Sequence, residues 1–293
     1  MLEAIQWADQ MRGIYFLAND RVLDLAIAFL NSFRVHNPRL ALCFIPFDDS
    51  IDELLRLRES YAFTVFNNRH ALSQCDEISR TFHGECVGQY RKLAMWEGEF
   101  DEFIYVDVDT VVLEPLDFCF EFLAEYDFIT SHSNMPKTRR WVWRDTILDT
   151  NMLQPEQMNY AANTGFIISR GGVLTFDGVV TGLLNARALM PHMELLCTEQ
   201  PFLNYLIVTS GCRYSSLSAI ASKGRRKNIP LGRWSHSLPG YIDKGRVIVP
   251  TTRAPVLLVH WAGEWQRGSH ESNPLWTYYR HLNDRDSRLE PGI

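Results

Sequence analysis

The sequence predicts an α/β fold built on a mainly parallel β-sheet, with helices on both faces. From Gly13 onward, short apolar runs alternate with helical patterns, which is the order of repeated strand–helix units. The apolar runs are nearly continuous, as is typical of strands that are covered on both faces. The composition agrees with this class, because 46% of the 293 residues are hydrophobic and 22% are charged.

The first half of the chain gives the clearest alternation. The run GIYFLA at residues 13–18 is rich in strand formers, and Asn19 and Asp20 after it supply turn and N-cap chemistry. Apolar residues then recur with a helical period over residues 22–33. Further strands are expected at residues 40–47, 63–67 and within 99–113, and further helices at about 50–60 and 89–97.

The second half is more irregular, and no segment of it looks like a linker. A single domain over residues 1–293 is therefore expected. We expect strands at residues 128–131, 164–169 and 256–260, a helix within 191–208, and loops at 223–230 and 232–244.

Charge and cysteine usage limit the cellular setting. A formal net charge of −6 argues against a nucleic-acid partner. The first residues lack the pattern of a signal peptide, and no apolar run approaches the ~20 residues of a membrane span. The six cysteines are irregularly spaced, as in reduced proteins, so a cytoplasmic location is expected. Two basic runs, at residues 137–144 and 223–228, are expected to be solvated. Any membrane contact that they make is expected to be peripheral.

The most informative segment is FIYVDVDTVVL, residues 103–113, in which Asp107 and Asp109 stand two apart at the end of an apolar strand. Residues two apart on a strand point to one face, so these carboxylates repel one another unless a cation lies between them. Mg²⁺ or Mn²⁺ fits, because hard cations prefer oxygen ligands, and a nucleotide diphosphate would fill the remaining positions. Ligands of such sheets bind beyond the carboxyl ends of the strands, where Asn19 and Asp20 are also expected. The alternative is a strand end that simply turns into a solvated loop.

The segment YVDVDTVVLEPLD, residues 105–117, resembles the DxD segment of GT-A glycosyltransferases. The resemblance is closest to glycosyltransferase family 8, the glycogenin and galactosyltransferase group. Other segments also match the family: LAND at 17–20, RKL at 91–93, NTGF at 163–166, TEQPFLN at 198–204 and VHWAG at 259–263. Each motif is weak alone, but their common order over about residues 13–267 is fairly specific.

This resemblance implies the GT-A fold, with a mainly parallel, Rossmann-like sheet. It implies a nucleotide-binding half at about residues 13–115, an acceptor and sugar half at about 116–270, and a polar C-terminal tail. His260 would complete a metal site with Asp107 and Asp109, and an imidazole ligand suits Mn²⁺ better than Mg²⁺.

The resemblance also assigns the remaining site residues. Glu199 and Pro201 stand where the family has aspartates, and Arg267 would replace a family lysine at the diphosphate. Gln200 and Glu199, which would line the sugar face, are the catalytic candidates. The sugar nucleotide, expected to be a UDP-sugar, would contact Asn19, Asp20, Lys92, Asp107, Asn163, Gly165, Gly263 and Arg267.

The implied reaction moves a hexose from a nucleotide-diphosphate sugar to an acceptor hydroxyl with retention of configuration. An inverting route would instead need a general base beside that hydroxyl. A glycan, a lipid-linked glycan, a protein or a small molecule would all fit as the acceptor.

Other interpretations remain open. A lone histidine such as His260 after an apolar strand is often a hydrogen-bonded structural residue. The chain as a whole could be a non-catalytic protein that binds a sugar nucleotide or a glycan. A sugar-phosphate nucleotidyltransferase would need a glycine-rich loop after the first strand, and Asn19, Asp20 and Arg21 stand there instead.

Overall fold

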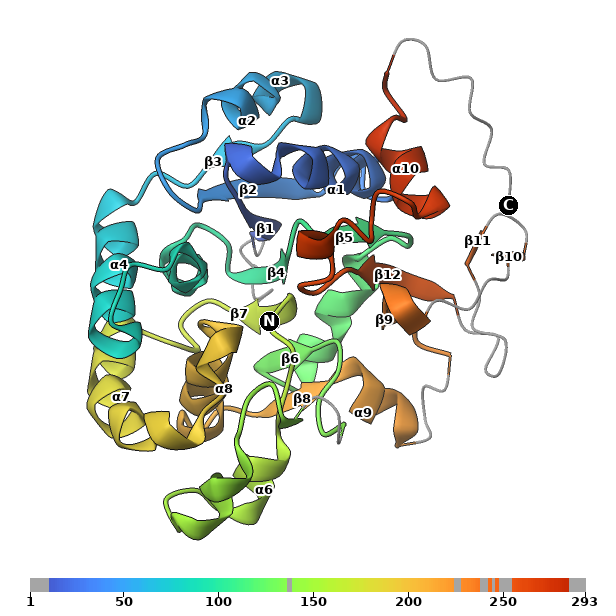
Figure 1. The fold of residues 1–293 in the computed structure, drawn as a ribbon. Helices are drawn as coiled ribbons and strands as arrows, with labels where there is room; N and C mark the ends of the chain where they lie inside the picture. Colours follow the sequence, from blue (N-terminus) through green and yellow to red (C-terminus); the bar gives the residue numbers. More distant parts are fainter. Residues whose placement is uncertain are drawn as a thin grey trace, which may run out of the picture.

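This computed structural model describes residues 11–135, 139–223, 228–237, 242–243, 246–247 and 255–284. Its centre is a seven-stranded sheet in the order β3-β2-β1-β4-β7-β6-β8 (Figure 1). The strands of this sheet are β1 (Arg12–Ala18), β2 (Ala41–Pro46), β3 (Thr64–Val65), β4 (Glu102–Val106), β6 (Phe128–Thr130), β7 (Phe166–Arg170) and β8 (Tyr214–Ser216).

The strand directions confirm the predicted mainly parallel sheet. The pairs β1–β2, β1–β4, β2–β3 and β6–β8 are parallel. Strand β7 is antiparallel to both of its neighbours, β4 and β6. The carboxyl ends of β1 and β4 therefore lie side by side at one edge of the sheet.

Helices cover both faces of the sheet, as predicted (Figure 1). Alternate residues of β1 enter two different cores: Ile14 and Phe16 one, and Tyr15 and Leu17 the other. The first core is shared with α1 (Leu23–His36) and α10 (Pro274–Arg280). The second core is shared with α4 (Arg69–His83), the 3₁₀ helix η2 (Gly88–Glu97), α7 (Phe176–Leu189) and α8 (Gln200–Thr209).

A second, three-stranded sheet has the order β5-β12-β9. Its strands are β5 (Thr110–Val112), β12 (Val256–His260) and β9 (Leu231–Trp234). Strand β12 runs antiparallel to β5 and parallel to β9. This sheet therefore joins a C-terminal strand to the segment that directly follows β4.

The remaining elements are short. Strands β10 and β11 form a separate antiparallel pair. Among the described residues, no helix is long and apolar enough to cross a membrane. The short remaining elements are α2 (Asp52–Arg56), α3 (Arg58–Tyr61), α6 (Pro155–Asn159), α9 (Leu217–Ser222), β10 (Ile242–Asp243) and β11 (Arg246–Val247).

Several predicted elements differ from the structure. Helices α4 and α7 were not anticipated, and the helix expected at 50–60 is divided into α2 and α3. The segment at 232–244, expected to be a loop, begins inside β9. The single strand expected within 99–113 is wrong, because β4 ends at Val106 and β5 begins at Thr110 in a different sheet. Residues 137–138 and 224–227 of the two basic runs, and 285–293 of the expected polar tail, lie outside the described residues.

Candidate active site

Asp107 and Asp109 lie in the turn that connects the two sheets. The Asp107 amide donates to the carbonyl of Gly165 at 2.8 Å, so Asp107 is tied to the start of β7. The Asp109 carbonyl accepts from the Trp261 amide at 2.9 Å, so Asp109 is tied to the end of β12. The expectation that both carboxylates share one face of a continuous strand is therefore wrong. They converge because each backbone is fixed to a different sheet.

His260 lies next to the two aspartates, although about 150 residues separate it from them in the sequence. It is the last residue of β12 and pairs in register with Thr110 of β5, directly after Asp109. Its Nε2 atom lies 3.0 Å from Asp109 Oδ1 and 3.8 Å from Asp107 Oδ2. One ligand atom from each of the three side chains lies within 4.8 Å of the others.

The chemistry of this cluster, Asp107–Asp109–His260, suits a divalent cation. Asp109 Oδ1 is buried and has His260 Nε2 3.0 Å away as its ionic partner, in a geometry that is poor for a hydrogen bond. A buried carboxylate oxygen without a donor costs free energy unless a cation contacts it. Two carboxylates and one imidazole are the donor set expected for Mn²⁺ or a similar ion.

Gly165 provides the space beside the cluster. A Cβ atom added there would lie 2.4 Å from His260 Cε1, 2.7 Å from Asp107 Oδ2 and 3.0 Å from Asn163 Oδ1. Any side chain at this position would therefore fill the space between the ligand atoms. Glycine is required here for close approach rather than for an unusual backbone angle.

The charges within the cluster shift the pKa values of its buried groups. Burial lowers the pKa of His260, but its interactions with Asp109 and Asp107 together outweigh burial and leave the pKa above the ordinary value. Burial raises the pKa of Asp109, but His260 and Lys92 together with a backbone hydrogen bond outweigh burial and leave the pKa below the ordinary value. The pair is therefore stabilised in its charged form, and a metal ion would have to replace the proton on His260.

Lys92 links this cluster to a second buried carboxylate. Its Nζ atom lies 3.0 Å from Asp107 Oδ1 and donates to Glu199 Oε1 at 2.8 Å. Burial lowers the pKa of Lys92, but Asp107 and Glu199 together raise it above its usual value. The hydroxyls of Thr164 and Thr198 also donate to Glu199, at 2.9 and 2.7 Å. Glu199 is thus fully engaged by one cation and two hydroxyls.

Replacing Lys92 with methionine is expected to lower the free energy of unfolding by about 3–5 kcal/mol, because Glu199 would remain buried without a counter-charge. Urea denaturation followed by tryptophan fluorescence measures this. Arg56→Met is the matched control, since Arg56 pairs with Glu53 at 2.7 Å on the exposed surface and should cost at most about 1 kcal/mol. Equal effects of the two variants would contradict the prediction.

Gln200 connects three segments around the cluster. Its Oε1 atom accepts from Asn163 Nδ2 and from the Thr164 amide, each at 3.2 Å. Its Nε2 atom donates to the carbonyl of Trp141 at 2.9 Å. The Gly165 amide in turn donates to Asn163 Oδ1 at 3.0 Å. The predicted turn at Asn163 and Gly165 thus lies between Gln200 and the Asp107–Asp109–His260 cluster.

Asn19 and Asp20 follow β1, at the same sheet edge as Asp107. Asn19 Nδ2 donates to Asp48 Oδ2 at 2.7 Å. The Asp20 carboxylate accepts from the amides of Glu53 and Leu54, at 3.2 and 3.1 Å, and so holds the first turn of α2. Asp20 therefore has the capping chemistry expected of it, but it acts on α2 rather than on the helix that follows β1.

The last two predicted residues follow β12. Gly263 has a φ of +69°, and nothing lies within 4 Å of the position that a Cβ would take. Arg267 is exposed in the short 3₁₀ helix η8 (Trp265–Arg267). Both lie on the segment that leaves the Asp107–Asp109–His260 cluster.

Three residues of this region were not anticipated. Tyr105 is fully buried, and its hydroxyl donates to Asp107 Oδ1 at 2.6 Å. Burial and the nearby Asp107 charge raise its pKa well above the ordinary value, so the hydroxyl stays protonated. Thr164 and Thr198 hold Glu199. For Tyr105 the available signal was its position two residues before Asp107 in the sequence.

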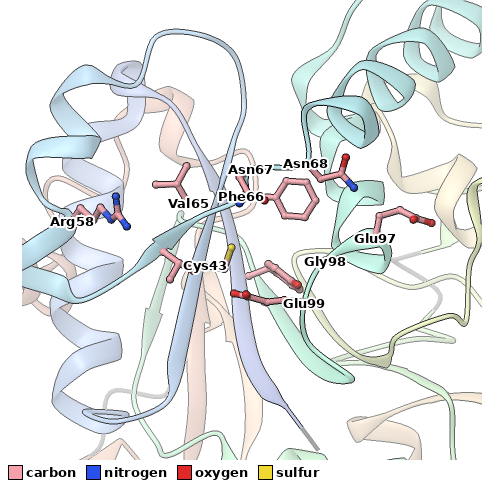
Figure 2. Close-up of a pocket in the computed structure, with 11 residues that line it drawn as sticks. Cys43, Arg58, Val65, Phe66, Asn67, Asn68, Glu97, Gly98 and Glu99 are labelled. Carbon is pink, nitrogen blue, oxygen red and sulfur yellow. The ribbon is translucent and has the colours of Figure 1, made fainter.

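A separate pocket of about 870 Å³ is lined by residues other than those of this cluster (Figure 2). Three of its lining residues, Glu97, Gly98 and Glu99, come before β4 in the sequence, whereas Asp107 directly follows β4. None of the predicted site residues is among those that line it, so we do not assign the active site to this pocket. The lining residues are Tyr15, Cys43, Arg58, Thr64, Val65, Phe66, Asn67, Asn68, Glu97, Gly98 and Glu99.

Comparison with solved structures identifies the fold. The chain is similar to the galactosyltransferase LgtC solved with donor and acceptor sugar analogs, with a TM-score of 0.56 and 16% identity over 93% of this chain and 96% of that chain. It is also similar to an active-site mutant of LgtC, with a TM-score of 0.54 and 15% identity over 86% of this chain and 88% of that one.

A third similar structure is the apo form of the bifunctional glycosyltransferase WbbM. Its TM-score is 0.53 and its identity 11%, over 89% of this chain and 47% of that chain, so this chain spans about half of WbbM. No family model and no curated protein matches this sequence. The chain therefore has the fold of GT-A glycosyltransferases, as the sequence predicted.

Proposed function

We propose that this protein is a metal-dependent glycosyltransferase that moves a hexose from a nucleotide-diphosphate sugar, expected to be a UDP-sugar, to an acceptor hydroxyl. The observation that carries the proposal is the Asp107–Asp109–His260 cluster, which lies beyond the carboxyl end of β4 in a GT-A fold. LgtC, which shares this fold, was solved with donor and acceptor sugar analogs. The same two kinds of partner are proposed here.

Mn²⁺ is the proposed ion, because an imidazole beside two carboxylates suits it better than Mg²⁺. Asp107, Asp109 and His260 would hold it, and when bound it supplies Lewis-acid chemistry at the diphosphate leaving group. The convergence of these three side chains, with Asp109 Oδ1 buried 3.0 Å from His260 Nε2, supports this assignment.

The other residues of the chain would bind and orient the donor. Asn19 lies at the end of β1, where the nucleoside is proposed to bind, and Arg267 is exposed after β12, where it would meet the diphosphate. The turn at Asn163 and Gly165 would approach the sugar. Gln200 is the proposed residue at the sugar face, because it bridges this turn to the Trp141 segment.

Glu199 receives a narrower role than the sequence indicated. Its carboxylate contacts Lys92, Thr164 and Thr198, and the residue is only 3% exposed. These contacts support a role in holding Lys92 rather than a role as a nucleophile at the sugar. Transfer with retention remains our proposal, and NMR of the product anomer tests it, since an inverted product would contradict it.

A second candidate is a non-catalytic protein that binds a sugar nucleotide or a glycan. It is favoured by one observation, namely that every polar atom of Gln200 described above is already used within the protein.

All six cysteines lie among the described residues and are free, which supports the proposed cytoplasmic location.

Donor hydrolysis distinguishes these candidates. The purified protein is incubated with UDP- and GDP-sugars, with and without Mn²⁺, and release of the nucleoside diphosphate is measured. We expect release from a UDP-sugar only in the presence of the ion. Binding of a donor without release from any donor would favour the binding protein. Release without added ion after chelation would overturn metal dependence.

A further inference from the structure

The two oxygens of the Asp107 carboxylate have different neighbours. Oδ1 accepts from the Tyr105 hydroxyl at 2.6 Å and lies 3.0 Å from Lys92 Nζ. Oδ2 faces the other way, 3.8 Å from His260 Nε2 and 2.7 Å from the position of a Cβ on Gly165. One oxygen is therefore engaged by the protein, and the other is turned toward the space next to His260.

Local sequence explains how Tyr105 reaches Asp107. Tyr105 lies in β4, on the face covered by η2 and α8, and Asp107 directly follows the last residue of that strand, within reach of the Tyr105 hydroxyl. Tyr105 is fully buried, which fixes its ring, and Lys92 Nζ lies 5.0 Å from the centre of that ring. A hydrogen bond of 2.6 Å from a hydroxyl to a carboxylate is in the short range of charge-assisted bonds.

We propose that Tyr105 is a positioning residue that holds Asp107 so that only Oδ2 is offered to a metal ion. This inference rests on the proposed metal-dependent function. The hydroxyl would keep Oδ1 out of the coordination sphere, so Asp107 would bind the ion through a single oxygen. That arrangement leaves more coordination positions for the oxygens of a diphosphate.

Lys92 alone does not provide the same restraint. Its ammonium is shared between Asp107, at 3.0 Å, and Glu199, at 2.8 Å, so it does not act on Asp107 alone. The Tyr105 hydroxyl donates to Asp107 Oδ1, and its buried ring fixes the direction of that bond. Rotation of the Asp107 carboxylate would break its hydrogen bond to Tyr105, and this opposes any change in which oxygen faces the ion.

The test is the variant Tyr105→Phe, which removes the hydroxyl and keeps the ring beneath Lys92. Mn²⁺ affinity of the purified protein, without donor, is measured by isothermal titration calorimetry. We expect Tyr105→Phe to bind Mn²⁺ about 10- to 100-fold more weakly, as is typical when a group that orients a metal ligand is lost.

Tyr15→Phe is the matched control. Tyr15 is also fully buried, pairs in register with Tyr105 on the neighbouring strand, and has its hydroxyl near Gly98, before β4. It should lose a buried hydroxyl without any change in Mn²⁺ affinity. Thermal denaturation of both variants shows whether each is folded, which separates a positioning role from a general loss of structure.

The outcomes are distinguishable. Wild-type affinity in Tyr105→Phe would overturn the inference and leave the proposed function standing. No Mn²⁺ binding by the wild-type protein, either alone or with UDP present, would overturn both. Equal losses in Tyr105→Phe and Tyr15→Phe would show a structural role and overturn the inference. Should Tyr105→Phe fail to fold, a crystal of the wild-type protein soaked with Mn²⁺ decides, because coordination through both Asp107 oxygens would contradict the proposal.

Discussion

Replacing Asp109 with asparagine is expected to reduce metal-dependent sugar transfer by about a thousandfold, which corresponds to about 4 kcal/mol of transition-state stabilisation. Asp109 is 9% exposed, and its Oδ1 atom lies 3.0 Å from His260 Nε2. Asparagine has the same shape but no negative charge, so the proposed ion would lose one of its two anionic ligands. The fold should survive, because the backbone bond between the Asp109 carbonyl and Trp261 is unchanged.

Initial rates of UDP release over a range of Mn²⁺ concentrations measure this loss, and thermal denaturation checks the fold. Asp117→Asn is the control, because Asp117 is an exposed carboxylate in a 3₁₀ helix away from the cluster. It should retain wild-type activity. A fully active Asp109→Asn protein would contradict the metal hypothesis altogether.

The second large effect is expected from Gly165→Ala, which should weaken Mn²⁺ binding and activity by about a hundredfold or more. The added methyl group would lie 2.4 Å from His260 Cε1, a distance that real contacts do not reach. Either the histidine or the Asn163 turn must then move. Both movements disturb the alignment of the ligand atoms without removing any of them.

Calorimetric titration with Mn²⁺ and steady-state kinetics report both losses. Gly178→Ala provides the control, since Gly178 lies in the first turn of α7 and its added Cβ would meet only Thr175 Oγ1, at 3.2 Å. That variant should bind Mn²⁺ like the wild type. Normal Mn²⁺ affinity in Gly165→Ala would show that the ion, if bound, lies elsewhere.

Much of the fold could be predicted from the sequence because apolar runs mark buried strands directly. Strand β12 was predicted with its observed bounds, Val256–His260. The grouping of His260 with the aspartates came from the resemblance alone. Spacing along a sequence contains no information about which strands pair, and the pairing of β5 with β12 is what brings these residues together.

The missed helices have identifiable causes. Helix α4 carries a buried stripe at Ala71, Cys75, Ile78 and Phe82 with the spacing of an amphipathic helix, so its signal was present in the sequence and was overlooked. Helix α7 contains two glycines, which lower its helix propensity, and packing against α8 overrides this.

The division of residues 103–113 into two strands was not visible in the sequence, because the apolar run continues on both sides of the aspartates. The change of sheet depends on β12, which pairs with β5 from the far end of the chain. Tyr105 was overlooked for a similar reason. A tyrosine in an apolar strand fits a core equally well, and only the packed structure shows where its hydroxyl points.

The turn at Asp107–Asp109 also connects the two sheets to each other. One aspartate is bonded to the start of β7 in the seven-stranded sheet, and the other to the end of β12 in the three-stranded sheet. An ion held by both would stabilise the folded state by mass action, by a free energy that grows with the logarithm of its concentration over its dissociation constant. Because its ligands are attached to both the seven-stranded and the three-stranded sheet, that free energy would oppose separation of the two sheets. Loading the site would thus make unfolding of the early and late parts of the chain a single, shared event.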